Sequence, residues 1–253
     1  MTIVVIFAQN GLMKITEKID KKIDRFNDGS TFTYQQLGIE SAEFGAAAKA
    51  MGRLVKKGTV QRASTGLFYK PKKTAFGVLK PKEEELLKPY LFEGNNRTAY
   101  VTGPSLYNRL GLTTQISNNI KVASRNKRVI ARIGNLKISP VKSYVDVTND
   151  NYYLLEILDA LKDFKKIPDR DQQLTITRLT AIIKELKDTE TQRLVKYALN
   201  YPPRVPALLG ALLDNMDKRA NLETLKRKLN PLTVYSYGIR KELLPTKSYW
   251  NIE

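Results

Sequence analysis

The sequence predicts an α+β protein, mainly helical, with an N-terminal winged helix-turn-helix, a small central α+β domain and a C-terminal helical domain. Apolar residues recur at helical spacing near the start of the chain and again after residue 150, whereas strand-like runs dominate the middle. The 253 residues are enough for two or three small domains. We place the domains at residues 13–81, 82–150 and 151–253, and interpret residues 1–12 as an extension before a second Met-Lys start.

The first domain is predicted to begin with three helices. Isoleucines four residues apart indicate a helix over about residues 15–26, and residues 33–37 indicate a short second helix. Ser41 is the expected cap of a third helix, which Gly58 ends. This third helix has an apolar face and a second face rich in glycine, alanine, lysine and arginine.

A hairpin is expected directly after the third helix. Residues 60–62 and 67–69 suit two strands, and the turn 63–66 joins them. Three helices followed by a two-stranded hairpin is the order of a winged helix-turn-helix. In such a domain the third helix enters the major groove of DNA, and its N-terminal half meets the base edges.

The rest of the chain is predicted to combine a small sheet with a helical end. The central domain is expected to hold helices at residues 83–91 and 105–110 and strands at residues 98–102, 119–123, 128–133 and 136–141. Gly134-Asn135 favours a tight hairpin turn between the last two strands. The C-terminal domain is expected to hold helices over about residues 150–161, 174–186, 189–200, 205–216 and 222–229, the third with a Thr189–Gln192 capping box.

Charge and composition narrow the function. Lys and Arg number 43 against 25 Asp and Glu, a formal net charge of +18, and the chain contains no His and no Cys. Thiol chemistry, disulfides, histidine general bases and zinc sites built from Cys or His are therefore excluded. Residues 1–82 carry 15 basic and 6 acidic residues, and the segment between Glu43 and Glu83 carries no acidic residue at all. This uneven distribution of charge predicts a polyanionic partner. Nucleic acid is the leading candidate, and an anionic membrane surface is the second candidate.

The candidate DNA-binding residues lie on the outer face of the third predicted helix and on the hairpin that follows. Small residues at the start of the helix would allow a close approach, and the cations behind them would reach bases or phosphates. The set comprises Gly45, Ala46, Lys49, Arg53, Lys56, Lys57, Arg62, Ser64, Thr65, Lys70, Lys72 and Lys73. The alternative interpretation is a solvated helix face and, for Arg53, a partner within the domain.

A second basic surface is expected in the central domain. Its candidate residues are Lys121, Arg125, Lys127, Arg128 and Arg132. Alternation along residues 128–133 places Arg128, Ile130 and Arg132 on one face of a strand. That face suits a phosphate backbone and equally suits an ordinary solvent-exposed side of a sheet.

The sequence favours no catalytic residue, metal site or cofactor, so the expected protein is not an enzyme. The one carboxylate pattern of familiar shape is Asp171 followed by Glu185-Leu186-Lys187, which resembles magnesium sites of nucleases. On an amphipathic helix such triplets are common as salt-bridge partners. The apolar run at residues 3–8 is too short to span a bilayer, and no positive residue precedes it, so we expect a cytoplasmic protein without a membrane partner.

Three segments resemble the AbiEi-type antitoxin family, the antitoxin and regulator halves of abortive-infection (type IV) toxin–antitoxin pairs. The stretch AMGRLVKKGTVQRASTGLFYKPK (residues 50–73) is similar to the winged-helix signature of that family, with Gly52 where a Ser or another small polar residue is more usual. SLYNRLGLTTQI (105–116) and YALNYPPRVPALLGALL (197–213) resemble two further motifs of the family in the same order.

The resemblance implies a bacterial protein that binds its own operator DNA, represses its operon and neutralises a toxin encoded nearby, commonly a nucleotidyltransferase-like protein. Composition and spacing by themselves predict only the DNA-binding part.

Two alternatives stay open. In the first, the C-terminal helices hold the toxin directly, through Tyr201–Arg204 and the tail near Trp250. In the second, the protein is a magnesium-dependent nuclease that uses Asp171 and Glu185.

Overall fold

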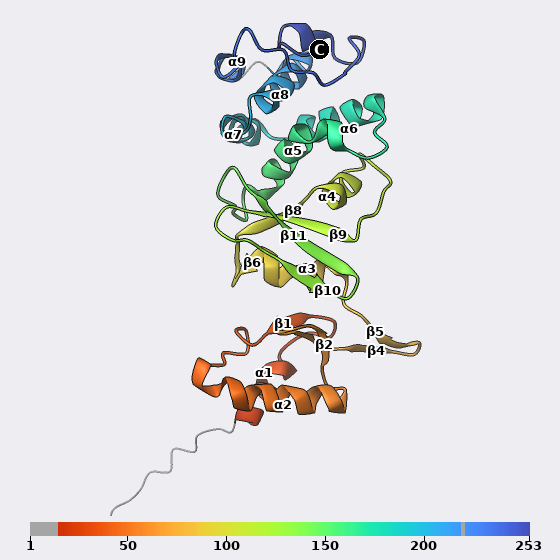
Figure 1. Cartoon of the computed structure of the whole chain (residues 1–253), viewed down its shortest axis with the longest axis vertical. Helices are drawn as coiled ribbons and strands as arrows, with labels where there is room; N and C mark the ends of the chain where they lie inside the picture. The colour runs from red at the N-terminus through yellow and green to blue at the C-terminus, as the bar shows by residue number, and fades with distance from the viewer. Residues whose placement is uncertain (1–14, 219–220) are drawn as a thin grey trace, which may run out of the picture. The chain divides into compact units, whose positions relative to one another are not determined.

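The computed structural model describes residues 15–218 and 221–253 (Figure 1). Residues 1–12, which the sequence predicts as an extension, lie outside the described residues. The chain forms two compact units, the first ending at Pro89 and the second running from Tyr90 to Glu253. Helices and small sheets occur in both units, so the predicted α+β class is confirmed. None of the helices in the described ranges is long and apolar enough to cross a bilayer.

Two helices and a small sheet enclose the core of the first unit. Helix α1 (Ile15–Asp24) packs against α2 (Phe44–Lys57), which a 3-10 turn (Ser41–Glu43) precedes. Helix α2 ends at Gly58, whose φ of 73° lies in the left-handed region that glycine adopts without strain. Their apolar faces meet in a core of buried residues that comprises Ile19, Ile23, Phe32, Leu37, Ala47, Ala50, Met51, Leu54, Val60 and Phe68.

The three-stranded sheet of the first unit corrects one prediction. Its strands are β1 (Thr31–Thr33), β2 (Gln61–Ser64) and β3 (Leu67–Tyr69), in the order β1-β3-β2 with antiparallel pairing. The expected hairpin β2–β3 is present, but the helix expected over residues 33–37 is wrong. That segment is the end of β1 and a single hydrogen-bonded turn. The β-branched and aromatic residues of β1 pair with β3 instead of continuing a helix.

The start of α2 also differs from the prediction. Ser41 does not cap the helix, because it opens the 3-10 turn. The carboxylate of Glu43 instead accepts the backbone N–H of Glu40 at 3.1 Å. This contact satisfies a backbone donor that the helix itself leaves unpaired.

A second hairpin, absent from the sequence predictions, follows β3. It consists of β4 (Lys72–Thr74) and β5 (Gly77–Leu79), which pair antiparallel and form a sheet of their own. Figure 1 shows this hairpin extending away from the three-stranded sheet. Helix α3 (Glu83–Leu91) comes next in the chain, at the residues expected for it.

The sheet of the second unit has four strands in the order β10-β11-β9-β8. Their bounds are β8 (Ala99–Thr102), β9 (Asn119–Ser124), β10 (Ala131–Ile133) and β11 (Leu136–Lys142). Strands β9 and β11 run parallel, and the other neighbours run antiparallel. The predicted tight turn at Gly134-Asn135 is confirmed, because Ile133 lies opposite Leu136 across β10 and β11. Helix α4 (Pro104–Arg109) and the short ribbon of β6 (Phe92–Glu93) and β7 (Asn96–Arg97) complete this part.

Helices form the rest of the second unit. They are α5 (Tyr152–Lys162), α6 (Gln172–Lys184), α7 (Asp188–Ala198), α8 (Arg204–Asn215) and α9 (Leu222–Arg227), with 3-10 turns at Phe164–Lys166 and Pro245–Ser248. The predicted Thr189–Gln192 capping box is wrong, because α7 begins one residue before Thr189. The carboxylate of Glu190 accepts the backbone N–H of Lys187 at 2.9 Å instead.

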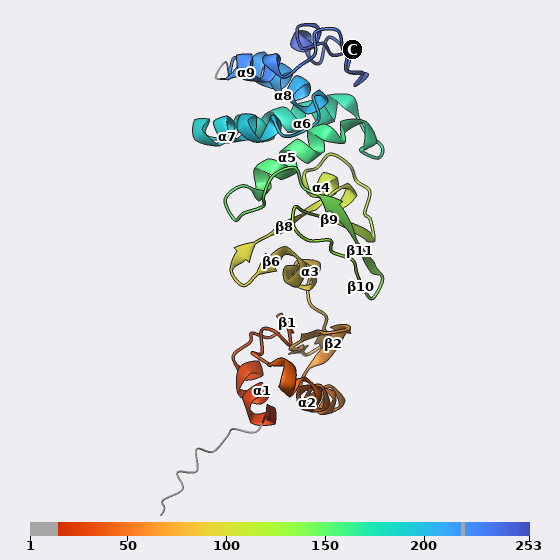
Figure 2. The same ribbon diagram turned by 60° about the vertical axis from the view of Figure 1, so that its left-hand side comes forward.

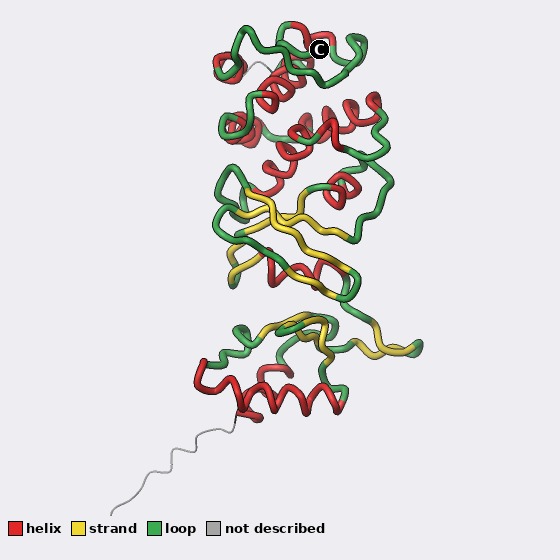
Figure 3. Tube along the Cα trace, viewed as in Figure 1, coloured by secondary structure: helices red, strands yellow, loops and turns green. Residues whose placement is uncertain are grey.

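One hydrophobic core runs through the whole second unit. Tyr100 and Leu106, from the sheet region, belong to the same buried cluster as Leu158, Leu208 and Trp250 from the helical region. Figure 2 shows α5 lying next to the sheet, with α6 to α9 beyond it, and Figure 3 shows the strands gathered at one end of this unit. Residues on both sides of position 150, where the sequence predicts a domain boundary, therefore pack in a common interior.

Candidate nucleic-acid interface

Helix α2 buries most of its apolar residues on one face and exposes its cations on the other, while Phe44 at its start is 52% exposed. Ala47, Ala50, Met51 and Leu54 are buried against the rest of the first unit. The candidate residues of the opposite face are all exposed, and they are Gly45, Ala46, Lys49, Arg53, Lys56 and Lys57. A 14-residue helix is about 21 Å long. The exposed face is therefore long enough to follow a major groove over several base pairs.

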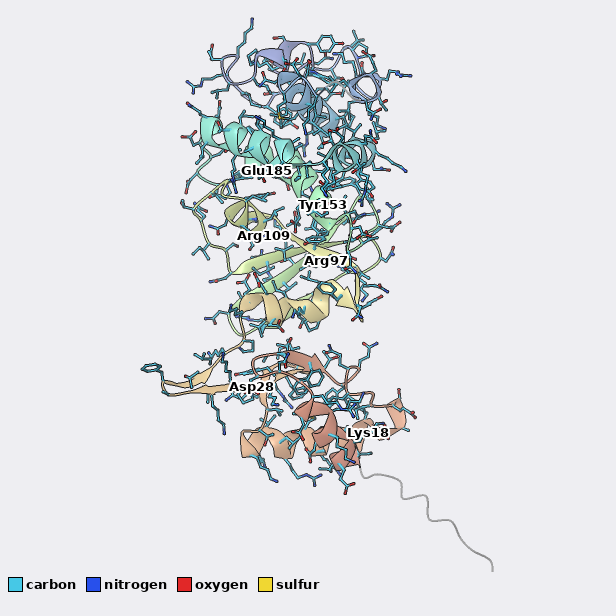
Figure 4. All side chains as sticks on the ribbon, turned by 180° about the vertical axis from the view of Figure 1, so that it is seen from behind. Lys18, Asp28, Arg97, Arg109, Tyr153 and Glu185 are labelled. Atoms are coloured by element: carbon cyan, nitrogen blue, oxygen red, sulfur yellow. The ribbon has the colours of Figure 1, made fainter. Side chains whose placement is uncertain are left out.

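An ion pair within the unit neutralises the acidic residue at the start of α2. The ammonium of Lys18, which is labelled in Figure 4, donates to the Glu43 carboxylate at 3.0 Å. This hydrogen bond and the one from the Glu40 backbone lower the pKa of Glu43, so that its charge is balanced by Lys18. The cations further along α2 therefore face solvent beside a carboxylate that is already paired.

Arg53 has a partner inside the domain, as the alternative interpretation expected. Its guanidinium donates to the hydroxyl of Thr16 on α1 at 3.3 Å, while the residue as a whole stays exposed. Thr16 is neutral, so the contact orients the guanidinium without cancelling its charge.

The hairpin β2–β3 carries the next predicted residues. Arg62 is exposed on β2, and its guanidinium lies 5.4 Å from the ring centroid of Phe68 on the neighbouring strand. Ser64 and Thr65 lie at the turn, where Gly66 has a φ of 76°. The cation–π contact holds the Arg62 side chain along the hairpin and leaves its N–H groups to solvent.

Lys70 has a structural role in the first unit. Its ammonium donates to the carbonyl oxygens of Phe26 at 3.1 Å and of Asp24 at 3.5 Å, and lies 3.5 Å from the carboxylate of Asp28. Cations are favoured at this position, because the carbonyl end of a helix carries partial negative charge. Lys70 thus caps α1, whereas the other lysines predicted beside it, Lys72 and Lys73, are exposed on β4.

The second predicted basic surface falls into two parts. Three of its residues line an open pocket of about 420 Å³, namely Arg125, Lys127 and Arg128. Arg125 lies 3.4 Å from the Asp146 carboxylate, and Lys127 pairs with Glu93. Carboxylates of the same unit therefore balance two of the three cations.

The remaining two residues lie on the exposed face of the sheet. Arg132 on β10 stands directly opposite Lys137 on β11, and Lys121 is exposed on β9. Like charges directly opposite each other destabilise a strand pair unless an anion lies between them. The predicted alternation agrees with the burial pattern, although the strand begins at Ala131 and not at residue 128.

Two arginines outside the predicted sets, Arg97 and Arg109, contact other side chains of the second unit (Figure 4). Arg109 donates to the Glu156 carboxylate at 2.6 Å, and burial raises the pKa of Glu156 while this partner opposes the rise. The guanidinium of Arg97 lies 3.8 Å from the ring centroid of Tyr152. Both side chains have partners within the second unit, although the Arg109 side chain remains 52% exposed.

The carboxylates of the nuclease hypothesis lie at opposite ends of one helix. Asp171 caps the start of α6, where its side chain accepts the N–H of Leu174 at 2.9 Å, and Glu185 follows the last residue of that helix. Fourteen helical steps separate them by about 21 Å. They cannot ligate one ion together, and no group of three or more His, Cys, Asp or Glu suited to a metal occurs among the described residues.

Sequence reasoning missed the most exposed apolar residue of the first unit's described part. Phe76, between β4 and β5, has a relative exposure of 100%. The signal was present in the sequence, as an aromatic residue next to a glycine within the acid-free segment.

Comparisons with known proteins identify a family and a similar fold. No curated protein matches this chain. The crystal structure of the RV2827C protein from Mycobacterium tuberculosis is similar, with a TM-score of 0.52 and 13% sequence identity over 87% of this chain and 82% of that chain. At this identity the likeness concerns the fold alone. DUF6088, described as a family of unknown function, matches residues 18–193, which is more than half of the chain, and the protein therefore belongs to the DUF6088 family.

Proposed function

We propose that this protein is a DNA-binding transcriptional regulator, and that residues 13–81 act as a winged helix-turn-helix. In this proposal α2 is the recognition helix, the hairpin β2–β3 is the wing, and the single turn at residues 34–38 stands where a second helix is usual. The observation that carries the proposal is the cationic, exposed outer face of α2 beside an antiparallel sheet of order β1-β3-β2.

Electrostatics supports DNA as the partner. Lys49, Lys56 and Lys57 on α2 and Arg62 on β2 belong to a segment without any acidic residue. Each cation that reaches a phosphate releases a counterion, which makes affinity high at low salt and steeply salt-dependent. The last two lysines of α2 also suit the helix dipole, so we assign them to phosphate contacts and Lys49 to the groove.

The double variant Lys49→Glu/Arg62→Glu is expected to weaken binding to duplex DNA from the protein's own promoter region by about 100-fold. Two cations lost from the interface should also lower the slope of log K against log salt by about 2. Fluorescence anisotropy at several salt concentrations measures both quantities.

The matched control is Lys228→Glu/Lys241→Glu, which changes the net charge equally at exposed positions of the second unit. We expect the control to bind within about threefold of the wild type at 0.15 M salt, because its charges do not belong to the proposed interface and exposed charges are screened. Unchanged affinity and slope in the α2–hairpin variant would contradict the placement of the DNA on this face.

We further propose that the regulator is the antitoxin of a type IV toxin–antitoxin pair and works in the cytoplasm. This part is supported by the three sequence segments that resemble the AbiEi-type family. The expected result is that the adjacent gene encodes a nucleotidyltransferase-like protein, that its expression alone stops growth, and that coexpression of this chain restores growth. Growth arrest that persists despite coexpression would overturn the antitoxin assignment and leave the DNA-binding assignment in place.

A specific observation favours direct contact with the toxin. Leu232 and Val234 are 93% and 61% exposed, and Tyr249 is 57% exposed. The side-chain amide of Asn251 donates to the carbonyl oxygens of residues 230, 231 and 233, which holds this loop beside the C-terminal segment. Exposed apolar side chains on two segments that are held side by side are typical of protein contacts.

Leu232→Asp/Val234→Asp is expected to abolish copurification with the toxin and to leave DNA binding unchanged. Buried charges at a protein interface are unfavourable, whereas the same charges in solvent are tolerated. Copurification equal to that of the wild type would show that this loop does not contact the toxin.

A further inference from the structure

The hairpin β4–β5 has features that the α2–wing proposal does not use. It forms a two-stranded sheet of its own, and Figures 1 and 4 show it extending from the body of the first unit. Its tip carries Phe76, which is 100% exposed, and β5 carries Val78 and Leu79, which are about half exposed. Three exposed apolar side chains within four residues of one projecting hairpin, unlike a single scattered one, are typical of a surface that contacts another molecule.

Hydrogen bonds hold the tip in one conformation. The hydroxyl of Thr74 donates to the carbonyl oxygen of Gly77 at 2.9 Å and accepts the backbone N–H of Phe76 at 3.3 Å. Gly77 has a φ of 112°, which a residue with a side chain rarely adopts. The chain therefore presents Phe76 on a fixed turn, and a fixed turn loses little conformational entropy when a partner binds.

The surroundings of Phe76 are cationic. Lys72 and Lys73 are exposed on β4, and Lys80 and Lys82 are exposed just beyond β5. No acidic residue occurs between Glu43 and Glu83, so the hairpin belongs to the same acid-free segment as α2. A partner that offers negative charge beside an apolar face would match both features. In duplex DNA, phosphates and base steps meet these two needs within a few ångströms of each other.

We propose that Phe76 is an apolar wedge that enters the minor groove of bound DNA and stacks against a base step, while Lys72 and Lys73 contact the flanking phosphates. The inference rests on the proposed DNA-binding function and adds a second contact to it. Apolar side chains inserted between base steps are a known means of minor-groove binding, and the aromatic–base contact tolerates different sequences.

Phe76→Trp places a fluorescent ring at the tip and tests the wedge directly. The only other Trp, Trp250, is fully buried in the second unit and serves as an internal reference. We expect duplex DNA to quench the new indole by half or more and to protect it from acrylamide, with wild-type fluorescence unchanged. If acrylamide quenches the new indole equally well with and without bound DNA, the wedge proposal is overturned.

Phe76→Ala tests what the ring contributes to affinity. We expect DNA affinity to fall about tenfold with an unchanged salt slope, because no charge is removed. Ile116→Ala is the matched control, since Ile116 is 89% exposed in the second unit and should have no effect. Circular dichroism of Phe76→Ala should match the wild type, because a fully exposed ring makes no contact that folding needs.

The outcomes separate the wedge from the proposed function. Normal affinity of Phe76→Ala together with weak binding of Lys49→Glu/Arg62→Glu overturns the wedge and leaves the α2 assignment standing. Absence of DNA binding by the wild type overturns both. A blue shift of the indole with anionic phosphatidylglycerol vesicles, and none with DNA, assigns the hairpin to a membrane surface and also overturns the wedge.

Discussion

Asp159→Ala is expected to lower the free energy of unfolding of the second unit by about 3–5 kcal/mol. Asp159 is 1% exposed. It accepts hydrogen bonds from Tyr100 at 3.0 Å, from Thr102 at 2.7 Å and from the ammonium of Lys162 at 2.7 Å. Truncation would leave two hydroxyls and one largely buried cation without this acceptor, and such groups cannot regain water inside the core.

The pKa of Tyr100 supports this account of the cluster. Burial, and then the charge of Asp159, raise the pKa of Tyr100 far above its usual value. Tyr100 therefore keeps its proton and remains a donor throughout the ordinary pH range. The carboxylate joins strand β8 to helix α5, so its loss is expected to loosen the contact between the sheet and the helical part.

Urea unfolding followed by the fluorescence of Trp250 measures the effect, because this single Trp lies in the core of the second unit. The double variant Asp159→Ala/Lys162→Met should lose less free energy of unfolding than the sum of the two single changes, since it also removes the ammonium that donates to Asp159. Glu242→Ala, at an exposed acidic position, is the control and should stay within about 0.5 kcal/mol of the wild type. A loss below about 1 kcal/mol for Asp159→Ala would contradict the buried-acceptor argument.

Gly210→Ala is expected to destabilise the second unit by about 2–3 kcal/mol, although alanine favours helices over glycine. A Cβ at Gly210 on α8 would overlap the six-membered ring of Trp250. Trp250 is fully buried and has a fixed position, because its indole N–H donates to the Asp214 carboxylate at 3.0 Å. The ring must move, and the tight packing around it must open.

Gly52→Ala on α2 is the matched control. Nothing lies within 4 Å of a Cβ at that position, so only the helix preference acts. We expect the free energy of unfolding of this variant to rise by about 0.5–1 kcal/mol. Circular dichroism during denaturation follows both variants, and the near-ultraviolet signal of Trp250 should change only in Gly210→Ala. An equal rise in the free energy of unfolding of both variants would show that the space between Gly210 and Trp250 accommodates a methyl group.

Local sequence signals predicted much of the fold. The period of apolar residues along α2 and the left-handed glycine at its end determine which face of that helix is exposed. The same holds for the tight turn at Gly134-Asn135, where two residues with a strong turn preference join two strands. In each case the signal lies within a few residues of the element that it determines.

The elements that sequence reasoning missed depend on partners far away in the chain. Strand β1 has three residues, too few to show alternation, and it forms because β3 pairs with it. Residues on both sides of position 150 pack into a common core because their apolar faces cover each other. Neither feature has a local signature, because each gains its stability from contacts between distant segments.

The sequence by itself determined the α+β class, most of the helices and the cationic outer face of α2, because helical periodicity and charge segregation are local properties of the chain. Only the tertiary structure decided which cations remain open to a partner. Lys70 caps α1 and Arg109 pairs with a buried carboxylate, whereas Lys49 and Arg62 face solvent and the β4–β5 hairpin presents Phe76. The physical reason is that the fold decides which groups come within hydrogen-bond distance of each charged side chain. The spacing of residues along the sequence does not give these distances.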